Sequence, residues 1–283
     1  MKPAPFRYAR PATAAEAVAL LASAPGEAKL LAGGQSLMPL LNMRLARPAV
    51  LVDVNGLGEL ARIEPGPDGG LVVGALVRHS DLAASPLVRE RAPLLAAAAR
   101  HVGHTAIRNR GTLGGSLAHA DPAAELPAAV LALDAAVGLL GPRGMRRVAA
   151  ADFFRGLLST ALAADELLAR VIVPAAPPGW GFAEMARRPG DFALAGVAVT
   201  LGARGHARIV GFGLADRPLR LRGAEALAAA APRDPTMPAR AGAAAGADCD
   251  PATDVHASAE YRRHLATVLT EDALREAVGR LGS

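Results

Sequence analysis

The chain has 283 residues, enough for two or three packed lobes, and hydrophobic residues make up 52% of it. Its net charge of +5 comes from scattered arginines without interleaved aromatic residues, which disfavours nucleic-acid binding. The single cysteine, Cys249, excludes an iron–sulfur cluster built from this chain alone, because such a cluster takes about four thiolates. No signal core is evident and no apolar run reaches the roughly 20 residues of a membrane helix, so we expect a cytoplasmic protein without a membrane span.

The first part of the chain predicts a small strand–helix–strand unit that ends near residue 56. Thr13-Ala14-Ala15-Glu16 is a capping-box pattern, which predicts a helix that starts there and runs through Leu21. The apolar stretches at 29–31 and 50–54 are typical of strands. We expect this unit to be the first of two lobes in one domain.

The second lobe, residues 57–176, mixes strands and helices. The sequence predicts strands at 71–77 and 167–173, a hairpin of 135–140 with 146–149, and helices that start at Ser80 or Asp81 and at Ser85 and continue to His101. The segment that follows His101 is predicted to be irregular and buried.

Pro177-Pro178-Gly179 marks the expected boundary between a domain of residues 1–176 and a C-terminal domain of residues 177–283. Strands are predicted at 182–185 and 207–212, and helices at 224–230 and 254–279. The stretch 231–250 is rich in Pro, Gly and Ala and predicts a flexible loop that contains Cys249.

Two glycine pairs carry the strongest functional signal: Ala32-Gly33-Gly34-Gln35-Ser36, and Thr112-Leu113-Gly114-Gly115-Ser116. Without a Cβ, the backbone N–H groups at such turns approach a ligand closely and form a concave anion nest. We expect a Cβ at Gly33 or Gly114 to obstruct this approach. Two nests far apart in sequence indicate one extended anion held from two sides, such as a dinucleotide pyrophosphate.

Other chemistries fit the sequence less well. Gly56-Leu57-Gly58-Glu59-Leu60-Ala61 matches a dinucleotide fingerprint, but Pro65-Gly66-Pro67 interrupts the helix that this mechanism requires. The hydrolase pattern G-x-S-x-G is absent around Ser36. The histidines lack zinc-enzyme spacing, so we expect no metal site; they are His79, His101, His104 and His119.

The two glycine motifs, with Pro39 and Arg44 after the first and Ile107 to Pro122 around the second, resemble the FAD-binding signatures of a known family. This family comprises the FAD-binding medium (flavoprotein) subunits of molybdenum hydroxylases, of the aerobic carbon monoxide dehydrogenase and xanthine dehydrogenase type. The resemblance extends to Pro189-Gly190-Asp191-Phe192-Ala193 and to Tyr261-Arg262-Arg263-His264-Leu265, and so covers the whole chain.

The resemblance implies an α+β fold: a two-lobed FAD-binding domain of the vanillyl-alcohol-oxidase (PCMH) type, with lobes of about 1–56 and 57–176, and a smaller C-terminal α/β domain. It implies FAD as the cofactor, a carboxylate contact from Glu125 with Asp121 as the nearby competitor, and an apolar contact from Leu168. The remaining residues that the resemblance assigns to FAD are Ala32, Gly33, Gly34, Gln35, Ser36, Thr112, Gly114, Gly115 and Ser116.

The implied role is electron transfer inside a larger complex. An iron–sulfur (2Fe-2S) small subunit would pass electrons to the FAD of this chain, which would deliver them to an external acceptor, while a molybdopterin-binding large subunit hydroxylates the substrate. The resemblance implies a dimer of such heterotrimers. Two alternatives stay open: a stand-alone flavin oxidase of a small molecule, which the scarcity of aromatic residues disfavours, and a non-enzymatic nucleotide-binding protein.

The sequence departs from the family at one position. The family often has a lysine near the flavin ring, and spacing from Arg188-Pro189-Gly190-Asp191 places Glu184 there. Either Glu184 faces the ring, where its carboxylate would disfavour the anionic reduced flavin, or it lies on the opposite strand face and points to solvent. In the first case we expect Glu184→Lys to raise the flavin midpoint potential.

Overall fold

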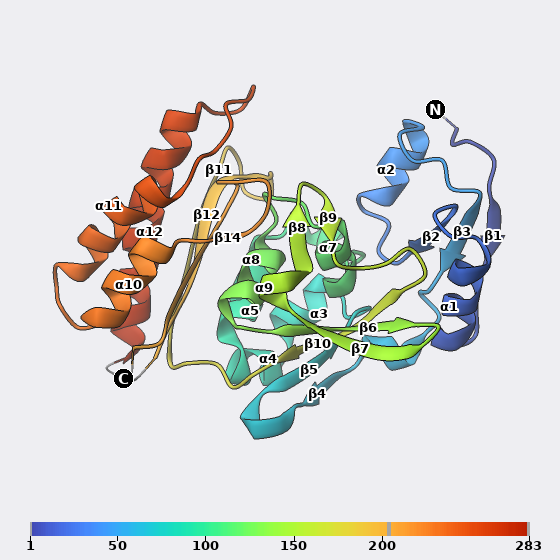
Figure 1. Ribbon diagram of the computed structural model, residues 1–283, viewed down its shortest axis with the longest axis horizontal. Coiled ribbons are helices and arrows are strands. Elements are labelled where there is room, and N and C mark those ends of the chain that lie inside the picture. Colours follow the sequence, from blue (N-terminus) through green and yellow to red (C-terminus); the bar gives the residue numbers. More distant parts are fainter. Residues whose placement is uncertain (1, 203–204, 282–283) are drawn as a thin grey trace.

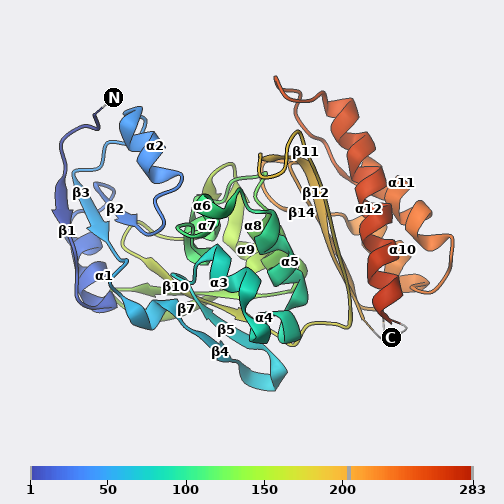
Figure 2. The same ribbon diagram turned by 180° about the vertical axis from the view of Figure 1, so that it is seen from behind.

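The computed structural model describes residues 2–202 and 205–281. They form three blocks in a row, with the N-terminal block at one end and the C-terminal helices at the other (Figures 1 and 2). Each block has its own sheet, and the buried apolar side chains form three clusters, of which the central one also takes in side chains of the C-terminal sheet. Within the described residues, no helix is both long and apolar enough to cross a membrane.

The N-terminal block is a three-stranded parallel sheet in the order β1-β3-β2. The predicted capping is confirmed, because the Thr13 side chain accepts a hydrogen bond from the backbone N–H of Glu16. Leu21 and Val18 of the first helix are buried against the sheet. The elements are β1 (Arg7–Ala9), α1 (Ala14–Ser23), β2 (Ala28–Leu31), α2 (Leu37–Asn42) and β3 (Val50–Asp53).

The central block is a five-stranded antiparallel sheet in the order β4-β5-β10-β6-β7, with short helices packed on it. The predicted hairpin is confirmed as β6 and β7, and the predicted strand 167–173 is confirmed as β10. The strands of this sheet are β4 (Ile63–Pro65), β5 (Leu71–Gly74), β6 (Ala136–Gly141), β7 (Gly144–Ala149) and β10 (Leu167–Val173). Strands β8 (Phe154–Gly156) and β9 (Ser159–Thr160) form a separate two-stranded sheet. The helices are η1 (Gly58–Ala61), η2 (Pro67–Gly69), α3 (His79–Ala84), α4 (Pro86–Arg91), α5 (Pro93–His101), α6 (Thr105–Arg108), α7 (Leu113–His119), α8 (Glu125–Ala132) and α9 (Ala150–Phe153).

Two predictions in this block are wrong in detail. The strand predicted to reach residue 77 ends at Gly74, where a Cβ would lie 2.2 Å from the carbonyl oxygen of Leu60, so the chain packs on η1 and turns. The segment predicted to be irregular after His101 contains two helices, α6 and α7. Helix α7 forms because Thr112 is its N-cap and accepts a hydrogen bond from the backbone N–H of Gly115 at 3.1 Å.

The C-terminal block is a four-stranded antiparallel sheet, β11-β12-β13-β14, that lies between the central helices and the three C-terminal helices (Figure 1). Its central strand β12 was not predicted. All nine of its residues are buried, so it lacks the alternation of apolar and polar residues that reveals a half-exposed strand. The elements are β11 (Gly179–Ala186), β12 (Ala193–Leu201), β13 (Ala207–Phe212), β14 (Leu219–Arg220), α10 (Arg222–Ala230), α11 (Met237–Asp248) and α12 (Ala259–Leu281).

The flexible loop predicted at 231–250 is also wrong, because most of it is helix α11. The glycines that lower its helix propensity allow close packing on α12: a Cβ at Gly242 would lie 2.6 Å from the carbonyl oxygen of Thr267, and one at Gly246 would lie 2.5 Å from the Thr267 hydroxyl. Cys249 follows the helix and is buried in the C-terminal core.

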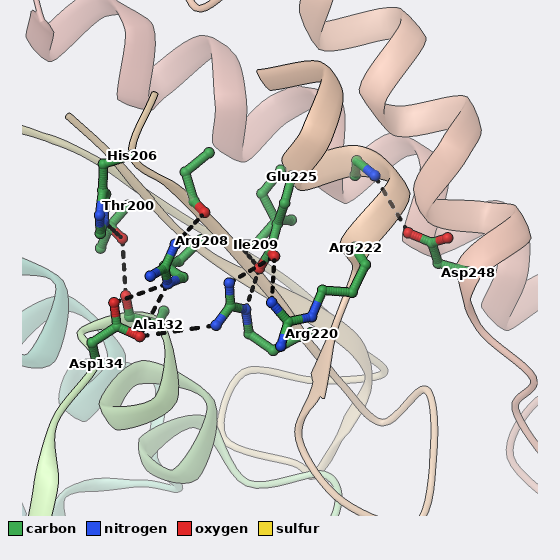
Figure 3. Close-up of polar contacts among 12 residues, drawn as sticks. Ala132, Asp134, Thr200, His206, Arg208, Ile209, Arg220, Arg222, Glu225 and Asp248 are labelled. Atoms are coloured by element: carbon green, nitrogen blue, oxygen red, sulfur yellow. Dashed lines mark hydrogen bonds and ion pairs between the residues drawn. The ribbon is translucent and has the colours of Figure 1, made fainter. Parts of the chain in front are cut away.

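A polar network fixes the C-terminal sheet to the central block (Figure 3). The Arg208 guanidinium donates a hydrogen bond of 3.0 Å to the carboxylate of Asp134, just after the end of α8. The Thr200 hydroxyl donates a hydrogen bond of 2.9 Å to the carbonyl of Ala132. Arg220 pairs with Glu225, which also accepts from a backbone N–H of β13. These contacts, together with buried apolar groups of β12 and α8, hold the sheet at a defined position on the central helices.

Candidate functional site

A cavity of about 810 Å³ lies between the N-terminal and central blocks, with the loop between β11 and β12 at its edge. This volume is in the upper part of the range of roughly 300–1,000 Å³ that is typical of ligand sites. The structure brings all twelve predicted site residues to its walls: Ala32, Gly33, Gly34, Gln35, Ser36, Thr112, Gly114, Gly115, Ser116, Asp121, Glu125 and Leu168.

The first glycine motif is the loop between β2 and α2, and it presents free donors. Within the described residues, the backbone N–H groups of residues 33–36 donate no hydrogen bond to the protein. Gly34 has a φ of +74°, a conformation that glycine adopts without strain, and the Gln35 side chain donates to the carbonyl of Gly33 at 2.9 Å. Consecutive free N–H groups on the wall of a cavity can hold an anion.

The second motif has a different role from the one predicted. Its N–H groups are already used: Leu113 donates to Val77 at 3.0 Å, Gly114 to Ala75 at 2.8 Å, and Ser116 to the carbonyl of Thr112 at 3.0 Å. The expectation of a second nest of free N–H groups is therefore wrong. The motif instead places the first turn of α7 in the cavity wall, with the Thr112 and Ser116 side chains beside it.

The glycines of both motifs are required by contacts with protein atoms. A Cβ at Gly33 would lie 2.4 Å from the carbonyl oxygen of Arg110, directly before the second motif, and a Cβ at Gly114 would lie 2.4 Å from the Cβ of Ala75. A Cβ would be obstructed at both positions, as expected. The reason is that the first motif packs against Arg110 and Gly111, which precede the second motif, and the second motif packs against Ala75, which follows β5.

A polar network that the sequence did not reveal supports both motifs. The Asn55 side chain donates to the carbonyl of Ala32 at 2.8 Å, and the Arg78 guanidinium donates to the Asn55 side chain at 2.7 Å and to the carbonyl of Arg110. Asp53 accepts from the backbone N–H of Asn55 at 3.0 Å. The bonds of Asn55 to Ala32 and of Arg78 to Asn55 and Arg110 join residues 23 to 32 positions apart, so no local pattern could have indicated them.

Asp53 also accepts a hydrogen bond of 2.5 Å from the Tyr8 hydroxyl, which ties the first strand to this network. Burial alone would raise the pKa of Asp53, but the hydrogen bonds from Tyr8 and Asn55 lower it below its usual value. Asp53 is therefore a carboxylate at neutral pH and a positioning group for the first motif.

His79 contributes an unpartnered polar group to the cavity wall. It is 4% exposed, and neither ring nitrogen has a partner in good hydrogen-bond geometry, although the Thr112 backbone lies close enough to oppose the effect of burial on its pKa. Burial lowers its pKa to about 4, so the imidazole is neutral and offers one donor and one acceptor. Such an orphaned pair of nitrogens is costly unless a bound group with polar edges satisfies it.

Glu125, the first residue of α8, is 7% exposed and lies at the cavity wall. Burial raises its pKa to about 7, and the nearby charge of Asp121 adds to this effect. Asp121 itself accepts a hydrogen bond from the backbone N–H of Ala123 at 2.9 Å. Two carboxyl groups, those of Glu125 and Asp121, therefore lie in this wall.

Both alternatives for Glu184 need correction. Its side chain is only 5% exposed, so the expectation that it points to solvent is wrong. It lies on β11, on the side that faces α5, with its Oε2 atom 3.6 Å from the Nδ1 atom of His101. It lines a separate, second cavity and not the wall of the first, and burial raises its pKa to about 8, so the carboxyl is mostly neutral at pH 7.

Phe192 was quoted in a motif but not predicted as a site residue. Its side chain is 72% exposed and lines the first cavity together with Gly190 and Asp191, so a large apolar ring is presented to whatever occupies the site. Arg108, by contrast, does not line this cavity, because it donates to the carbonyls of Val102 and Gly103. Among the described residues, no group of three or more His, Cys, Asp or Glu side chains could hold a metal ion.

Comparison with known proteins identifies the family of this chain and, through it, the cofactor to compare with the cavity. Residues 4–176 match the family described as "FAD binding domain in molybdopterin dehydrogenase", and residues 180–277 match "CO dehydrogenase flavoprotein C-terminal domain". The free N–H groups of the first motif fit a pyrophosphate, and the unpartnered nitrogens of His79 fit a ligand with polar edges.

The relatives span the whole chain. The nicotine 6-hydroxylase medium subunit of Paenarthrobacter nicotinovorans is 41% identical over 284 residues, which are 99% of this chain and 100% of that protein. The structure of carbon monoxide dehydrogenase from Hydrogenophaga pseudoflava superposes with a TM-score of 0.95 at 39% identity, over 99% of both chains. That of quinoline 2-oxidoreductase from Pseudomonas putida 86 superposes with a TM-score of 0.93 at 38% identity, also over 99% of both. The chain therefore belongs to the FAD-binding medium subunits of molybdenum hydroxylases of the carbon monoxide dehydrogenase and xanthine dehydrogenase type, an oxidoreductase family whose cofactor is FAD.

Proposed function

We propose that this chain is the electron-transfer subunit of a heteromeric molybdenum hydroxylase, in which its FAD takes electrons from an iron–sulfur subunit and passes them to an external acceptor. The observation that carries the proposal is the first cavity, in which a loop with free N–H groups and an orphaned buried histidine meet all the residues that the family resemblance assigns to FAD. FAD suits this position because it supports both one-electron and two-electron chemistry.

We assign the pyrophosphate to the N–H groups of residues 33–36, because this anion would satisfy the donors that the protein leaves free. The side chains of Thr112 and Ser116 would add hydroxyl contacts from α7, and Glu125 or Asp121 a carboxylate contact. Leu168 would pack on an apolar part of the cofactor, and Phe192 would exclude water at the cavity edge.

The two blocks around the cavity support a finer assignment of the fold. We propose a two-lobed FAD domain of the vanillyl-alcohol-oxidase (PCMH) type at residues 1–176, with a C-terminal flavoprotein domain at 177–283. The parallel sheet of the first lobe and the antiparallel sheet of the second flank the cavity, as this arrangement requires.

The proposed partners follow from what the chain lacks and from how its relatives are named. With one cysteine it cannot build an iron–sulfur cluster, so we propose a 2Fe-2S small subunit and a molybdopterin-binding large subunit, assembled in the cytoplasm as a dimer of heterotrimers. Relatives of about 40% identity are named for nicotine, caffeine and carbon monoxide. Similar medium subunits with such different substrates indicate that the substrate is selected in another polypeptide.

The experiment has two parts. The purified chain should show the visible absorption of oxidised flavin, with close to one FAD per chain, and artificial reductants should bleach it. The isolated chain should not oxidise organic substrates, whereas co-expression with the neighbouring coding sequences should yield a complex that does. A folded chain that never binds flavin would refute the proposal, and substrate oxidation by the chain alone would favour a stand-alone flavin oxidase.

A further inference from the structure

A second cavity of about 570 Å³ lies next to the first, between helix α6 and the ends of α5 and β11. Four arginines line it, and Glu184 is the one carboxyl group among its described lining residues. We call this cavity the basic groove, and its arginines are Arg100, Arg108, Arg187 and Arg188. Its volume lies in the range of roughly 300–1,000 Å³ that is typical of ligand sites.

One wall of the basic groove is the turn between α5 and α6, and the protein itself fixes its shape. The Arg108 guanidinium donates hydrogen bonds to the carbonyls of Val102 at 3.2 Å and Gly103 at 2.7 Å. Gly103 has a φ of +49°, and a Cβ at this position would lie 3.0 Å from the Ile107 side chain. Arg100, in the last turn of α5, adds a second guanidinium to this wall.

The other wall is the loop that follows β11, where residues 188–191 form a tight turn. The backbone N–H of Asp191 donates to the carbonyl of Arg188 at 3.1 Å. Pro189 and Gly190 are the two central residues, and Gly190 has a φ of +88°, as a type II turn requires. A Cβ at Gly190 would lie 2.9 Å from the carbonyl oxygen of Gly103, so this turn rests directly on the first wall.

Three of the four guanidinium groups lack a protein partner. Within the described part of the chain, the side chains of Arg100, Arg187 and Arg188 make no hydrogen bond or ion pair. Glu184 does not compensate for them, because its carboxyl lies at ion-pair distance from His101, 3.6 Å from the Nδ1 atom, and burial raises its pKa to about 8. The basic groove therefore holds positive charge from two separate segments that no lining group neutralises.

This chemistry fits an organic anion with a phosphate group. A planar guanidinium binds two oxygens of a phosphate or carboxylate with parallel N–H groups. A carboxylate carries one charge, whereas a phosphate group carries close to two at neutral pH, so phosphate matches three uncompensated guanidiniums better. Met185, which is 40% exposed, and Pro189 line the same groove and offer apolar contact to the rest of such a molecule.

The basic groove adjoins the first cavity. Gly103 and Gly190 line both spaces, and neither residue has a side chain that would add to the separation. A molecule held in the groove therefore lies against residues that also form the wall of the first cavity. This position suits a ligand that exchanges electrons with the occupant of that cavity.

We propose that the basic groove binds the external electron acceptor through a phosphate group, which Arg100, Arg187 and Arg188 hold. This inference rests on the proposed function, because it gives the acceptor of the FAD a place on this chain. An acceptor bound there takes up the two electrons that reoxidation of the reduced FAD releases, and the protons released with them pass to the acceptor or to solvent. The groove supplies position and charge only.

The first test is calorimetric titration of the full chain loaded with FAD, so that the first cavity is filled, with inorganic pyrophosphate as the probe. Arg187→Gln/Arg188→Gln should bind pyrophosphate at least about 10-fold more weakly than the wild type, because it removes charge-assisted hydrogen bonds. The matched control, Arg143→Gln/Arg147→Gln, removes two exposed arginines of the hairpin of β6 and β7 and should bind as the wild type does. Tighter binding of citrate than of pyrophosphate would overturn the assignment to phosphate.

The second test follows flavin absorption after the FAD has been reduced by light without oxygen. Ferricyanide, a trianion, stands in for the charged acceptor, and two ions each take one electron from one reduced FAD. Pyrophosphate should slow this reoxidation in the wild type, and Arg187→Gln/Arg188→Gln should be about 10-fold slower and insensitive to pyrophosphate, whereas reoxidation by uncharged benzoquinone should not change.

Two results would overturn the inference: pyrophosphate binding in Arg187→Gln/Arg188→Gln as tight as in the Arg143→Gln/Arg147→Gln control, or reoxidation by ferricyanide at equal rates in the two variants. Either result in a chain that retains FAD contradicts the acceptor site alone. A folded chain that binds no FAD contradicts the proposed function and the acceptor site together.

Discussion

Glu184 predicts a pH dependence of stability that can be worked out from its burial. Its pKa is raised from 4.5 to about 8 in the folded chain, mainly by desolvation. Below pH 4.5 the carboxyl is protonated in both the folded and the unfolded chain, so it does not make the stability depend on pH. Between these values the unfolded chain loses the proton and the folded chain keeps it, so folding becomes less favourable as the pH rises, and the full cost is reached above pH 8.

Replacement by glutamine removes the ionisable group and keeps its size. At about 1.4 kcal/mol for each pH unit between the two pKa values, Glu184→Gln should be more stable than the wild type by up to about 5 kcal/mol at pH 9, and nearly equal to it at pH 4.5. This is an upper limit, because water that enters between the domains would shield the charge.

Urea denaturation at pH 5 and at pH 9, followed by circular dichroism, measures the free energy of unfolding of both proteins. The matched control is Glu64→Gln, an exposed carboxyl on β4, whose effect should be small at both pH values. If the difference between Glu184→Gln and the wild type is the same at pH 5 and pH 9, Glu184 has a normal pKa and the reasoning from its burial is refuted.

Three further substitutions test the framework of the site. Asn55→Ala removes the side chain that bonds the first glycine motif, so we expect a loss of about 1–3 kcal/mol in unfolding free energy and a weaker retention of FAD, measured by dialysis and absorption. Gly33→Ala places a Cβ 2.4 Å from the carbonyl oxygen of Arg110 and should separate the two motifs, lowering the melting temperature and the FAD content together; loss of FAD without loss of stability would contradict this. Thr200→Val leaves the buried carbonyl of Ala132 unpaired and should cost about 1–3 kcal/mol, measured by urea denaturation, with FAD retained.

The sequence predicted those features whose cause is local. The capping box at Thr13, the hairpin of β6 and β7 and the strand β10 follow from side-chain patterns over a few residues, and the structure confirms them. The glycine motifs and their resemblance to a family likewise identified residues that converge on one cavity. Short-range chemistry was sufficient for these, because each pattern depends on its immediate neighbours.

The tertiary structure decided what depends on distant neighbours. Strand β12 was missed because all of its residues are buried, so it lacks the alternation of apolar and polar residues typical of a strand. Helix α11 was missed because its glycines, which allow it to pack closely on α12, lower the helix propensity of its sequence. The donors of the second glycine motif are used by the segment that follows β5 and by Thr112 of the motif itself, so of the two motifs the first keeps free N–H groups. Spacing along the sequence was enough to place Glu184 near the site. Its contact with His101, its burial and its neutral form at pH 7 depend on the tertiary structure, because they arise only when the C-terminal sheet packs on the central helices and excludes water from the carboxyl.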